Sequence, residues 1–150
     1  MNIAVFPGSF DPFTKGHESV VRKGIQLFDK VVVAIGSNSK KTSLFSMESR
    51  KTHIQSIFQN EIEVVDYQCL TVDLCHRFNA KFIIRGIRDT KDFEYENSIA
   101  HMNKVLGSIE TVFFTTEAEY TFINSSIVRE IYLNGGDISS FVTNSEILVK

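Results

Sequence analysis

The chain alternates short apolar runs with stretches in which apolar residues recur at helical spacing. Four runs are apolar throughout, as expected for strands buried on both faces of a parallel sheet: Ile3–Phe6, Val31–Ile35, Phe82–Ile84 and Val112–Phe114. A fifth run, Ile62–Val65, is partly alternating and fits an edge strand. Because proline cannot donate to a strand ladder, we expect the first strand to end at Phe6 or Pro7.

The stretches between these runs predict helices. His17 to Phe28 carries an apolar face, and Ser46 is the expected N-cap of a helix that runs to about Phe58. The buried stripe of this second helix comprises Met47, Ile54, Ile57 and Phe58. A shorter helix is predicted over Val72–Phe78.

Three more helices are predicted in the second half of the chain. Asp89 or Asp92 begins a long helix that Gly107 ends, with four apolar residues at helical spacing: Tyr95, Ile99, Met102 and Leu106. Ser125 or Ser126 begins the next helix as its N-cap, and Gly135-Gly136 ends it. Thr143 is expected to cap a last short helix.

This alternation of strands and helices predicts an α/β fold. Parallel strands need crossover helices, so we expect residues 1–150 to form one doubly wound, Rossmann-like domain with a five-stranded parallel sheet. Ligands of such sheets bind at the carboxyl ends of the strands. The residues that follow each strand are therefore the candidates for function.

Polar and cationic segments follow four of the five predicted strands. The first strand leads through the turn Pro7–Pro12 to a helix start near His17, a geometry that suits phosphate because the backbone N–H groups there lack intrahelical partners. The other three segments are Lys40-Lys41, Arg85–Asp89 and Glu117–Ser126. Each signal is weak by itself, and their convergence on one edge of the sheet favours a phosphate site.

Composition and absent motifs narrow the function. A net charge of -2 and a pI near 6.1 argue against a general nucleic-acid or membrane binder, and no apolar stretch approaches the length of a membrane span. Dinucleotide and P-loop glycine motifs, a nucleophile elbow and any His/Glu/Cys cluster with metal-ligand spacing are absent from the sequence. Cys69 and Cys75 are expected to be free thiols of a cytoplasmic protein.

Several segments resemble bacterial phosphopantetheine adenylyltransferases, which belong to the T-x-G-H nucleotidyltransferases. Pro7–Pro12 with Thr14–His17 resembles the opening motif of that family, and Arg85–Arg88 followed by Asp92–Glu96 and Ala100–Asn103 resembles its central signature. Tyr120–Ser126 resembles its late Ser-rich segment. The resemblance covers essentially the whole chain. It implies adenylyl transfer from ATP to 4'-phosphopantetheine, Mg²⁺ as cofactor and a homohexamer.

The resemblance also implies roles for individual residues. His17 matches the histidine that stabilises the transition state, and Lys41 and Arg88 match cations of the reaction, although Lys40 could replace Lys41 in register. The implied ATP-binding residues are Ser9, Phe10, His17, Gly86, Ile87, Arg88, Glu96, Tyr120, Thr121, Phe122, Ile123, Asn124, Ser125 and Ser126. The implied phosphopantetheine-binding residues are Ser9, Lys41, Thr71 and Arg85. Ser9 stands where the family commonly has Thr, and Asn124 where it has Ser.

The chemistry suits these residue types. A phosphate monoester is largely dianionic at neutral pH, so the nucleophile needs no general base, and catalysis reduces to positioning and charge stabilisation. Mg²⁺ would arrive with the nucleotide and need few protein ligands. His53, His76 and His101 are interpreted as structural or surface residues. Two alternatives remain open: a nucleotidyltransferase with another phosphorylated acceptor, and a non-catalytic nucleotide-binding module.

Overall fold

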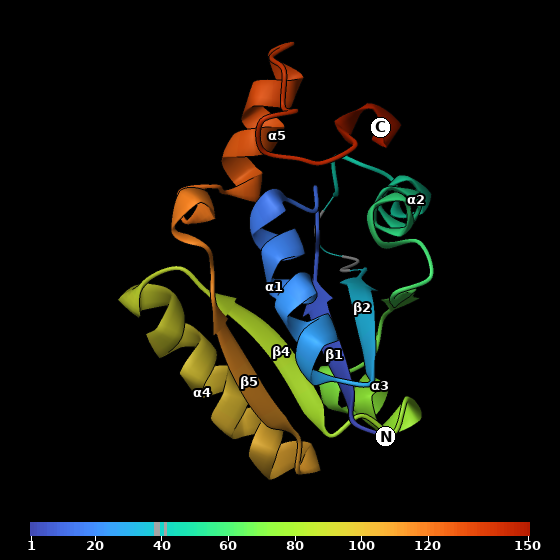
Figure 1. The fold of residues 1–150 in the computed structure, drawn as a ribbon, viewed down its shortest axis with the longest axis vertical. Coiled ribbons are helices and arrows are strands. Elements are labelled where there is room, and N and C mark those ends of the chain that lie inside the picture. The colour runs from blue at the N-terminus through green and yellow to red at the C-terminus, as the bar shows by residue number, and fades with distance from the viewer. Residues whose placement is uncertain (38–39, 41) are drawn as a thin grey trace.

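The computed structural model describes residues 1–37, 40 and 42–150 and contains one five-stranded parallel sheet (Figure 1). The strands are β1 (Ile3–Gly8), β2 (Lys30–Gly36), β3 (Glu63–Tyr67), β4 (Phe82–Ile87) and β5 (Glu110–Thr115). The α-helices are α1 (Lys15–Leu27), α2 (Met47–Phe58), α3 (Thr71–Arg77), α4 (Thr90–Gly107) and α5 (Ser125–Leu133). Two single-turn 3₁₀ helices, η1 (Ala118–Tyr120) and η2 (Ser145–Ile147), lie in the C-terminal third.

The strand order is β3-β2-β1-β4-β5, with every neighbouring pair parallel. The predicted doubly wound α/β fold is therefore confirmed, and β3 is an edge strand as expected. The chain first builds outward from β1 to β3 and then returns to place β4 on the other side of β1. This topological switch point between β1 and β4 is where such sheets bind ligands.

The predicted end of the first strand was wrong, because β1 continues through Pro7 to Gly8. Pro7 pairs with Ala34 of β2, whereas the pairing of β1 with β4 stops at Val5. No ladder partner on the β4 side therefore requires an N–H from Pro7. The Pro7 carbonyl instead accepts a hydrogen bond from Nη1 of Arg85 at 2.6 Å. Strands β1 and β4 thus separate at their carboxyl ends and open a crevice.

Helices cover both faces of the sheet. Helices α1 and α2 pack with Phe6, Val33 and Ile35 in one apolar cluster, and α3 packs with Val5 and Val32 in a cluster on the opposite face. Helix α5 and the C-terminal segment lie beyond the carboxyl ends of the strands (Figure 1). They form a third apolar cluster, which contains Phe45, Ile123, Val128, Ile138, Val142 and Leu148.

Most predicted helix ends are confirmed. The Ser46 side chain accepts from Ser49 N, and Asp89 rather than Asp92 caps α4. Gly135 has φ of 79° and donates to Tyr132 O, while Gly136 donates to Ile131 O. This pair of bonds is a Schellman motif, so the Gly-Gly pair ends α5 as expected.

Two predicted caps were wrong. The N-cap of α5 is Asn124, whose Oδ1 accepts from the N–H groups of Ser126 and Ile127. Asparagine is as good an N-cap as serine, so the sequence pattern alone could not distinguish Asn124 from Ser125 or Ser126. Thr143 does not cap the last helix, because its hydroxyl donates to Glu18 Oε2 at 2.7 Å.

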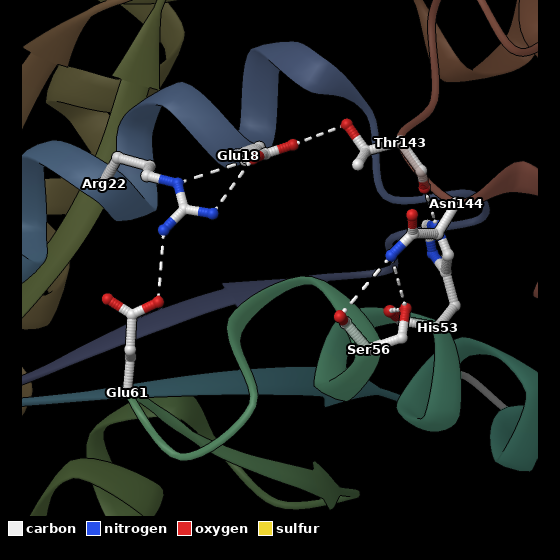
Figure 2. Close-up of polar contacts among 7 residues, drawn as sticks. All are labelled: Glu18, Arg22, His53, Ser56, Glu61, Thr143 and Asn144. Carbon is white, nitrogen blue, oxygen red and sulfur yellow. Dashed lines mark hydrogen bonds and ion pairs between the residues drawn. The ribbon is translucent and has the colours of Figure 1, made fainter.

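The Thr143 contact belongs to a polar cluster that ties the C-terminal segment to α1 and α2 (Figure 2). The Thr143 carbonyl accepts from Nε2 of the fully buried His53 at 2.7 Å, and Asn144 Nδ2 donates to Ser56 Oγ. On α1, Arg22 pairs with both Glu18 and Glu61. His53 is therefore a structural residue, as interpreted from the sequence.

Helix α4 differs from the other helices of the sheet layers. Its apolar stripe is exposed in the single chain, and among its residues only Glu96 is buried. The exposed apolar residues are Phe93, Tyr95, Ile99, Met102, Val105 and Leu106. Within the part of the chain that the structure describes, no helix combines the length and the hydropathy needed to cross a bilayer.

Candidate active site

Two cavities meet at the crevice between β1 and β4. The first basin, of about 440 Å³, lies toward α1, β4 and the start of α5; the second basin, of about 510 Å³, lies toward β2, α3 and α4. They share a wall made of Pro7, Gly8, Ser9, Arg85 and Glu96. Ser9, which was predicted to contact two substrates, therefore faces both basins.

His17 lines the first basin at the start of α1. Thr14 is the N-cap of this helix, and its backbone N–H donates to His17 Nδ1 at 3.0 Å. A backbone N–H can only donate, so Nδ1 is the unprotonated acceptor and the proton of neutral His17 resides on Nε2. The tautomer is thereby fixed by the capping box of α1. His17 offers an Nε2–H donor to the first basin.

The surroundings of His17 keep it neutral. Its ring contacts Phe6, Phe10 and Phe13, with centroid distances of 6.3, 5.1 and 5.4 Å. Desolvation, together with the positive charges of Arg85 and Arg88, lowers the pKa of His17 to about 4. At neutral pH the residue is a hydrogen-bond donor without a charge.

The guanidinium groups of Arg88 and Arg129 line the first basin together with His17. Arg88 Nε donates to Asp92 at 3.0 Å, and its Nη1 donates to the Ile123 carbonyl at 3.1 Å. Arg129, on α5, donates from Nη2 to Ser126 Oγ at 3.0 Å. Both side chains are held at one end by the protein, so the basin presents oriented positive charge.

Arg85 belongs to the wall that separates the two basins. Its Nε and Nη2 donate to the two carboxylate oxygens of Glu96 at 2.7 and 2.5 Å. Such a bidentate pair fixes the plane of the guanidinium group. Glu96, which the resemblance assigned to ATP, is thus the residue that orients Arg85.

The start of α5 closes the first basin. Asn124 caps the helix, which leaves both serine hydroxyls for other partners: Ser125 Oγ donates to the Pro12 carbonyl, and Ser126 Oγ accepts from Arg129. The exchange of Ser for Asn at position 124 therefore preserves a helix start at the basin.

Most of the predicted ATP-binding residues come together in the first basin. Its lining includes Ser9, Phe10, His17, Gly86, Arg88, Glu96, Tyr120, Ile123, Asn124, Ser125 and Ser126. Ile87, Thr121 and Phe122 belong to the same segments but do not line it. The ring of Phe122 instead packs edge-on against Phe141.

The second basin contains the predicted acceptor-side residues Ser9, Thr71 and Arg85. The Thr71 hydroxyl lies 3.4 Å from the hydroxyl of Tyr67. Thr111 Oγ1 is buried at this basin without a hydrogen-bond partner among the residues the structure describes. Lys41, the predicted phosphate contact, lies outside the described residues.

Sequence reasoning missed Arg129 and left Asp11 without a role. Arg129 lies three residues after Ser126, which on a helix places the two side chains on one face; this spacing was the available signal. Asp11 belongs to the recognised opening motif, but its partners, the N–H groups of Leu44 and Phe45, come from a distant segment.

The acidic groups of the first basin are engaged by the protein itself. Asp11 accepts from backbone N–H groups, Asp92 pairs with Arg88, and Glu96 pairs with Arg85. Among the described residues, no three His, Cys, Asp or Glu side chains gather as a metal-binding group. The donor set fits a metal ion that is held by substrate phosphates rather than by a protein cage.

Comparison with known proteins gives consistent results. The family model of cytidylyltransferase-like proteins matches residues 5–131. A phosphopantetheine adenylyltransferase of Flavobacterium psychrophilum is 49% identical over 144 residues, or 95% of each chain. Proteins of the same name from Lachnoclostridium phytofermentans and Bacteroides thetaiotaomicron are 47% and 44% identical, over 99% and 95% of this chain and 93% and 95% of their own lengths.

A solved structure shares the fold. It is a bifunctional NMN adenylyltransferase/ADP ribose pyrophosphatase from Francisella tularensis, complexed with AMP and a manganese ion. The TM-score is 0.73 at 20% identity, and the match covers 98% of this chain and 46% of that one. The chain therefore spans about half the length of that protein, and the likeness extends to the fold alone.

Proposed function

The chain belongs to the phosphopantetheine adenylyltransferase family and is a nucleotidyltransferase of coenzyme A biosynthesis, and we propose that it moves the adenylyl group of ATP onto the phosphate of 4'-phosphopantetheine. The products are dephospho-coenzyme A and pyrophosphate. The observation that carries the proposal is the pair of basins that meet at Ser9, because a transfer between two substrates needs two sites with a common wall.

The acceptor phosphate attacks the α-phosphate of ATP in line, and no covalent enzyme intermediate forms. The P–O bond to the acceptor forms as the bond to pyrophosphate breaks, and pyrophosphate carries away the electron pair. The acceptor monoester has a second pKa of about 6, so it is already largely dianionic at neutral pH. The protein therefore needs donors and cations here rather than a general base.

His17 acts on the phosphate under attack. Its Nε2–H, oriented through the Nδ1 contact with Thr14, donates to an α-phosphate oxygen whose hydrogen bond strengthens in the transition state. Because the low pKa keeps His17 neutral, it orients this oxygen without holding the product phosphate as an ion pair would.

The cations divide between the two substrates. Arg88 and Arg129 offset the charge of the triphosphate in the first basin, and Ser126 orients its oxygens. Arg85, held by Glu96, faces the acceptor phosphate across the shared wall. Lys41, or Lys40 in its place, adds a further cation on the acceptor side.

The neutral side of the second basin suits the rest of the acceptor. It offers the Thr71 hydroxyl and the Asn103 amide beside the apolar side chain of Ile99. The pantetheine arm is a chain of methylenes and amides that ends in a thiol, so it needs neutral hydrogen-bond partners and apolar contact rather than charge.

We propose that Mg²⁺ enters bound to ATP. The ion would supply charge neutralisation on the phosphate oxygens, and Asp92, which lines the first basin beside Arg88, would hold one of its waters. The cytoplasmic location and the absence of nucleic-acid and membrane partners stay predictions.

A homo-oligomer, implied as a hexamer by the family resemblance, is the proposed assembly. The exposed stripe of α4 supports it, since Met102, Val105 and Leu106 are 64%, 86% and 62% exposed in the single chain. Ile99, on the same helix, lines the second basin, so a subunit packed on α4 would also border the acceptor site. Sedimentation velocity measures the assembly directly.

A pyrophosphate-release assay tests the reaction. Purified protein with ATP and Mg²⁺ should release pyrophosphate when 4'-phosphopantetheine is added, and mass spectrometry should identify dephospho-coenzyme A. Nicotinamide mononucleotide and glycerol 3-phosphate serve as alternative acceptors, and CTP as an alternative donor. Turnover that is faster with another acceptor would reject the proposed substrate, and ATP binding without pyrophosphate release would favour a non-catalytic module.

A further inference from the structure

The turn that carries Ser9 has a strained backbone. Phe10 has φ of 47°, in the left-handed region that residues with a bulky side chain rarely adopt. Strain of this kind persists only where the surrounding structure imposes it, and it occurs preferentially at functional sites. The segment Ser9–Asp11, the Ser9 turn, must therefore be held in this conformation by its contacts.

The strained conformation brings the Phe10 ring over the end of β1. A Cβ added to Gly8 would lie 2.7 Å from the Phe10 ring, so the ring occupies the space that any other residue at position 8 would need. The same ring meets the His17 ring edge-on at 5.1 Å. The turn thus determines the placement of Ser9 and supports one face of His17.

Arg50 holds one side of the turn. This residue of α2 is only 4% exposed, and its Nη1 donates to the Ser9 carbonyl at 2.7 Å. Its Nε donates to the Phe45 carbonyl at 3.0 Å. The single guanidinium group therefore ties Ser9, the residue before Phe10, to Phe45, the residue before the N-cap of α2. Burial lowers the pKa of Arg50, and the charge of Asp11 raises it.

Asp11 holds the other side of the turn. Its carboxylate, 7% exposed, accepts from Leu44 N at 2.8 Å and from Phe45 N at 2.9 Å. Arg50 and Asp11 therefore reach the same peptide segment from the residues on either side of Phe10. This connection thus uses two buried charged side chains.

We propose that Arg50 and Asp11 are positioning residues of the adenylyl transfer: together they hold the Ser9 turn in its strained conformation and so set Ser9 against both substrates. Neither side chain needs to touch a reacting atom. They also join the turn to Leu44 and Phe45. The proposal rests on the proposed function of Ser9 at the shared wall of the two basins.

The test compares Arg50→Lys and Arg50→Met with the wild type. A displacement of about 1 Å in a reacting group can cost about a hundredfold in rate, so kcat should fall on the order of 10- to 100-fold in Arg50→Met. The dissociation constant for ATP should change by less than about threefold, because the Arg88 and α5 contacts persist. Lysine reaches one carbonyl but cannot span both, so Arg50→Lys should recover part of the rate.

Asp11→Asn provides a second variant if Arg50→Met fails to fold, and Lys51→Ala is the matched control. Lys51 lies next to Arg50 on α2, but it pairs with Asp66 on the surface, away from the turn. Lys51→Ala should have wild-type kinetics. Assays are run well below the melting temperature of each variant, where a purely stabilising role would leave kcat and both KM values unchanged.

The double variant Arg50→Lys/Asp11→Asn sharpens the test. Because both residues hold the same turn, the effects of the two substitutions on kcat should not add. The double variant should therefore be little slower than the slower single variant. Wild-type kinetics in folded single variants, or equal losses of kcat and ATP affinity, would overturn the proposal. Absence of pyrophosphate release by the wild type would instead reject the proposed function itself.

Discussion

The two basins that meet at Ser9 have walls of different chemistry. The first basin is lined by Arg88 and Arg129 in addition to the shared Arg85, and α5 points its N-terminus toward it. The second basin, within the described residues, has no charged side chain besides the shared Arg85 and Glu96. The charged half and the neutral half of the site are thus separated by the end of β1 together with Arg85 of β4 and Glu96 of α4.

This difference matches the two kinds of ligand that an adenylyl transfer brings together. A triphosphate needs oriented positive charge, and every arginine of the first basin is held by a carboxylate or a carbonyl. The pantetheine arm of the acceptor is long and uncharged, so it needs apolar contact area and a few hydrogen bonds. The reacting groups then meet only at the shared wall, where a small displacement affects both substrates.

The largest expected effect comes from removing the hydrogen-bond donor that His17 offers to the first basin. His17→Ala should lower kcat by about 10²- to 10³-fold, the cost of losing one preorganised transition-state donor, while the protein folds and binds ATP. Steady-state pyrophosphate release and ATP calorimetry measure the two quantities. The affinity of His17→Ala for ATP should change little, because Arg88 and Arg129 remain in the first basin.

His17→Gln and His76→Ala are the matched variants for this comparison. Glutamine retains an N–H donor and should recover part of the rate. His76 bonds to the Gly107 carbonyl outside both basins, so its replacement should leave kcat unchanged. Near-normal pyrophosphate release by His17→Ala would refute the catalytic role of His17.

One substitution in each basin separates the substrates. Arg88→Ala removes charge-assisted hydrogen bonds worth about 1.5–3 kcal/mol, so the KM for ATP should rise about 10- to 100-fold. Thr71→Val removes a neutral hydroxyl worth about 0.5–1.5 kcal/mol, so the KM for 4'-phosphopantetheine should rise about 2- to 10-fold. Initial rates with either substrate varied measure both constants.

The pair of variants serves as its own control, since each should leave the other substrate's KM near its wild-type value. A change confined to the acceptor KM in Arg88→Ala would reverse the assignment of the basins. Equal changes of both constants in both variants would mean that the two basins form one site.

Much of the fold followed from the hydrophobic pattern. Runs that are apolar throughout marked β1, β2, β4 and β5, and a partly alternating run marked the edge strand β3. The helix caps Ser46 and Asp89 followed from local side-chain chemistry. The end of β1 was misplaced because it depends on strand pairing that the local sequence does not reveal. Pairing with β4 stops at Val5, so the missing N–H of Pro7 breaks no hydrogen bond of the sheet. The Thr143 cap failed because Glu18, distant in sequence, takes the hydroxyl.

The site was only partly predictable. Motif positions located His17, Arg85 and Arg88 at the strand ends, and the structure brings them to one crevice. The tautomer of His17 and the strain at Phe10 depend on backbone geometry that a motif does not encode. The partners of Asp11 lie 33 and 34 residues away, so local spacing could not have suggested them.

The last expected effect is on the stability of the folded protein, and it tests the charged and aromatic surroundings of His17 in the first basin. His17 has a pKa of about 4 in the folded protein and 6.5 as its unperturbed value. Between these values the unfolded chain binds a proton that the folded chain does not, so the free energy of unfolding must fall as the pH falls. The loss should approach about 1.4 kcal/mol per pH unit and reach up to about 3 kcal/mol near pH 4.

Urea unfolding of the wild type and His17→Gln from pH 7.5 to 4.5 measures this contribution. Burial also lowers the pKa of His53, but His53 is present in both proteins and cancels in the difference. The unfolding free energy of the wild type minus that of His17→Gln should be constant above pH 6.5 and should decrease below it. A difference that stays flat to pH 4.5 would mean that His17 can be protonated in the folded protein, and hence that the phenylalanine rings and arginines around it do not keep it neutral.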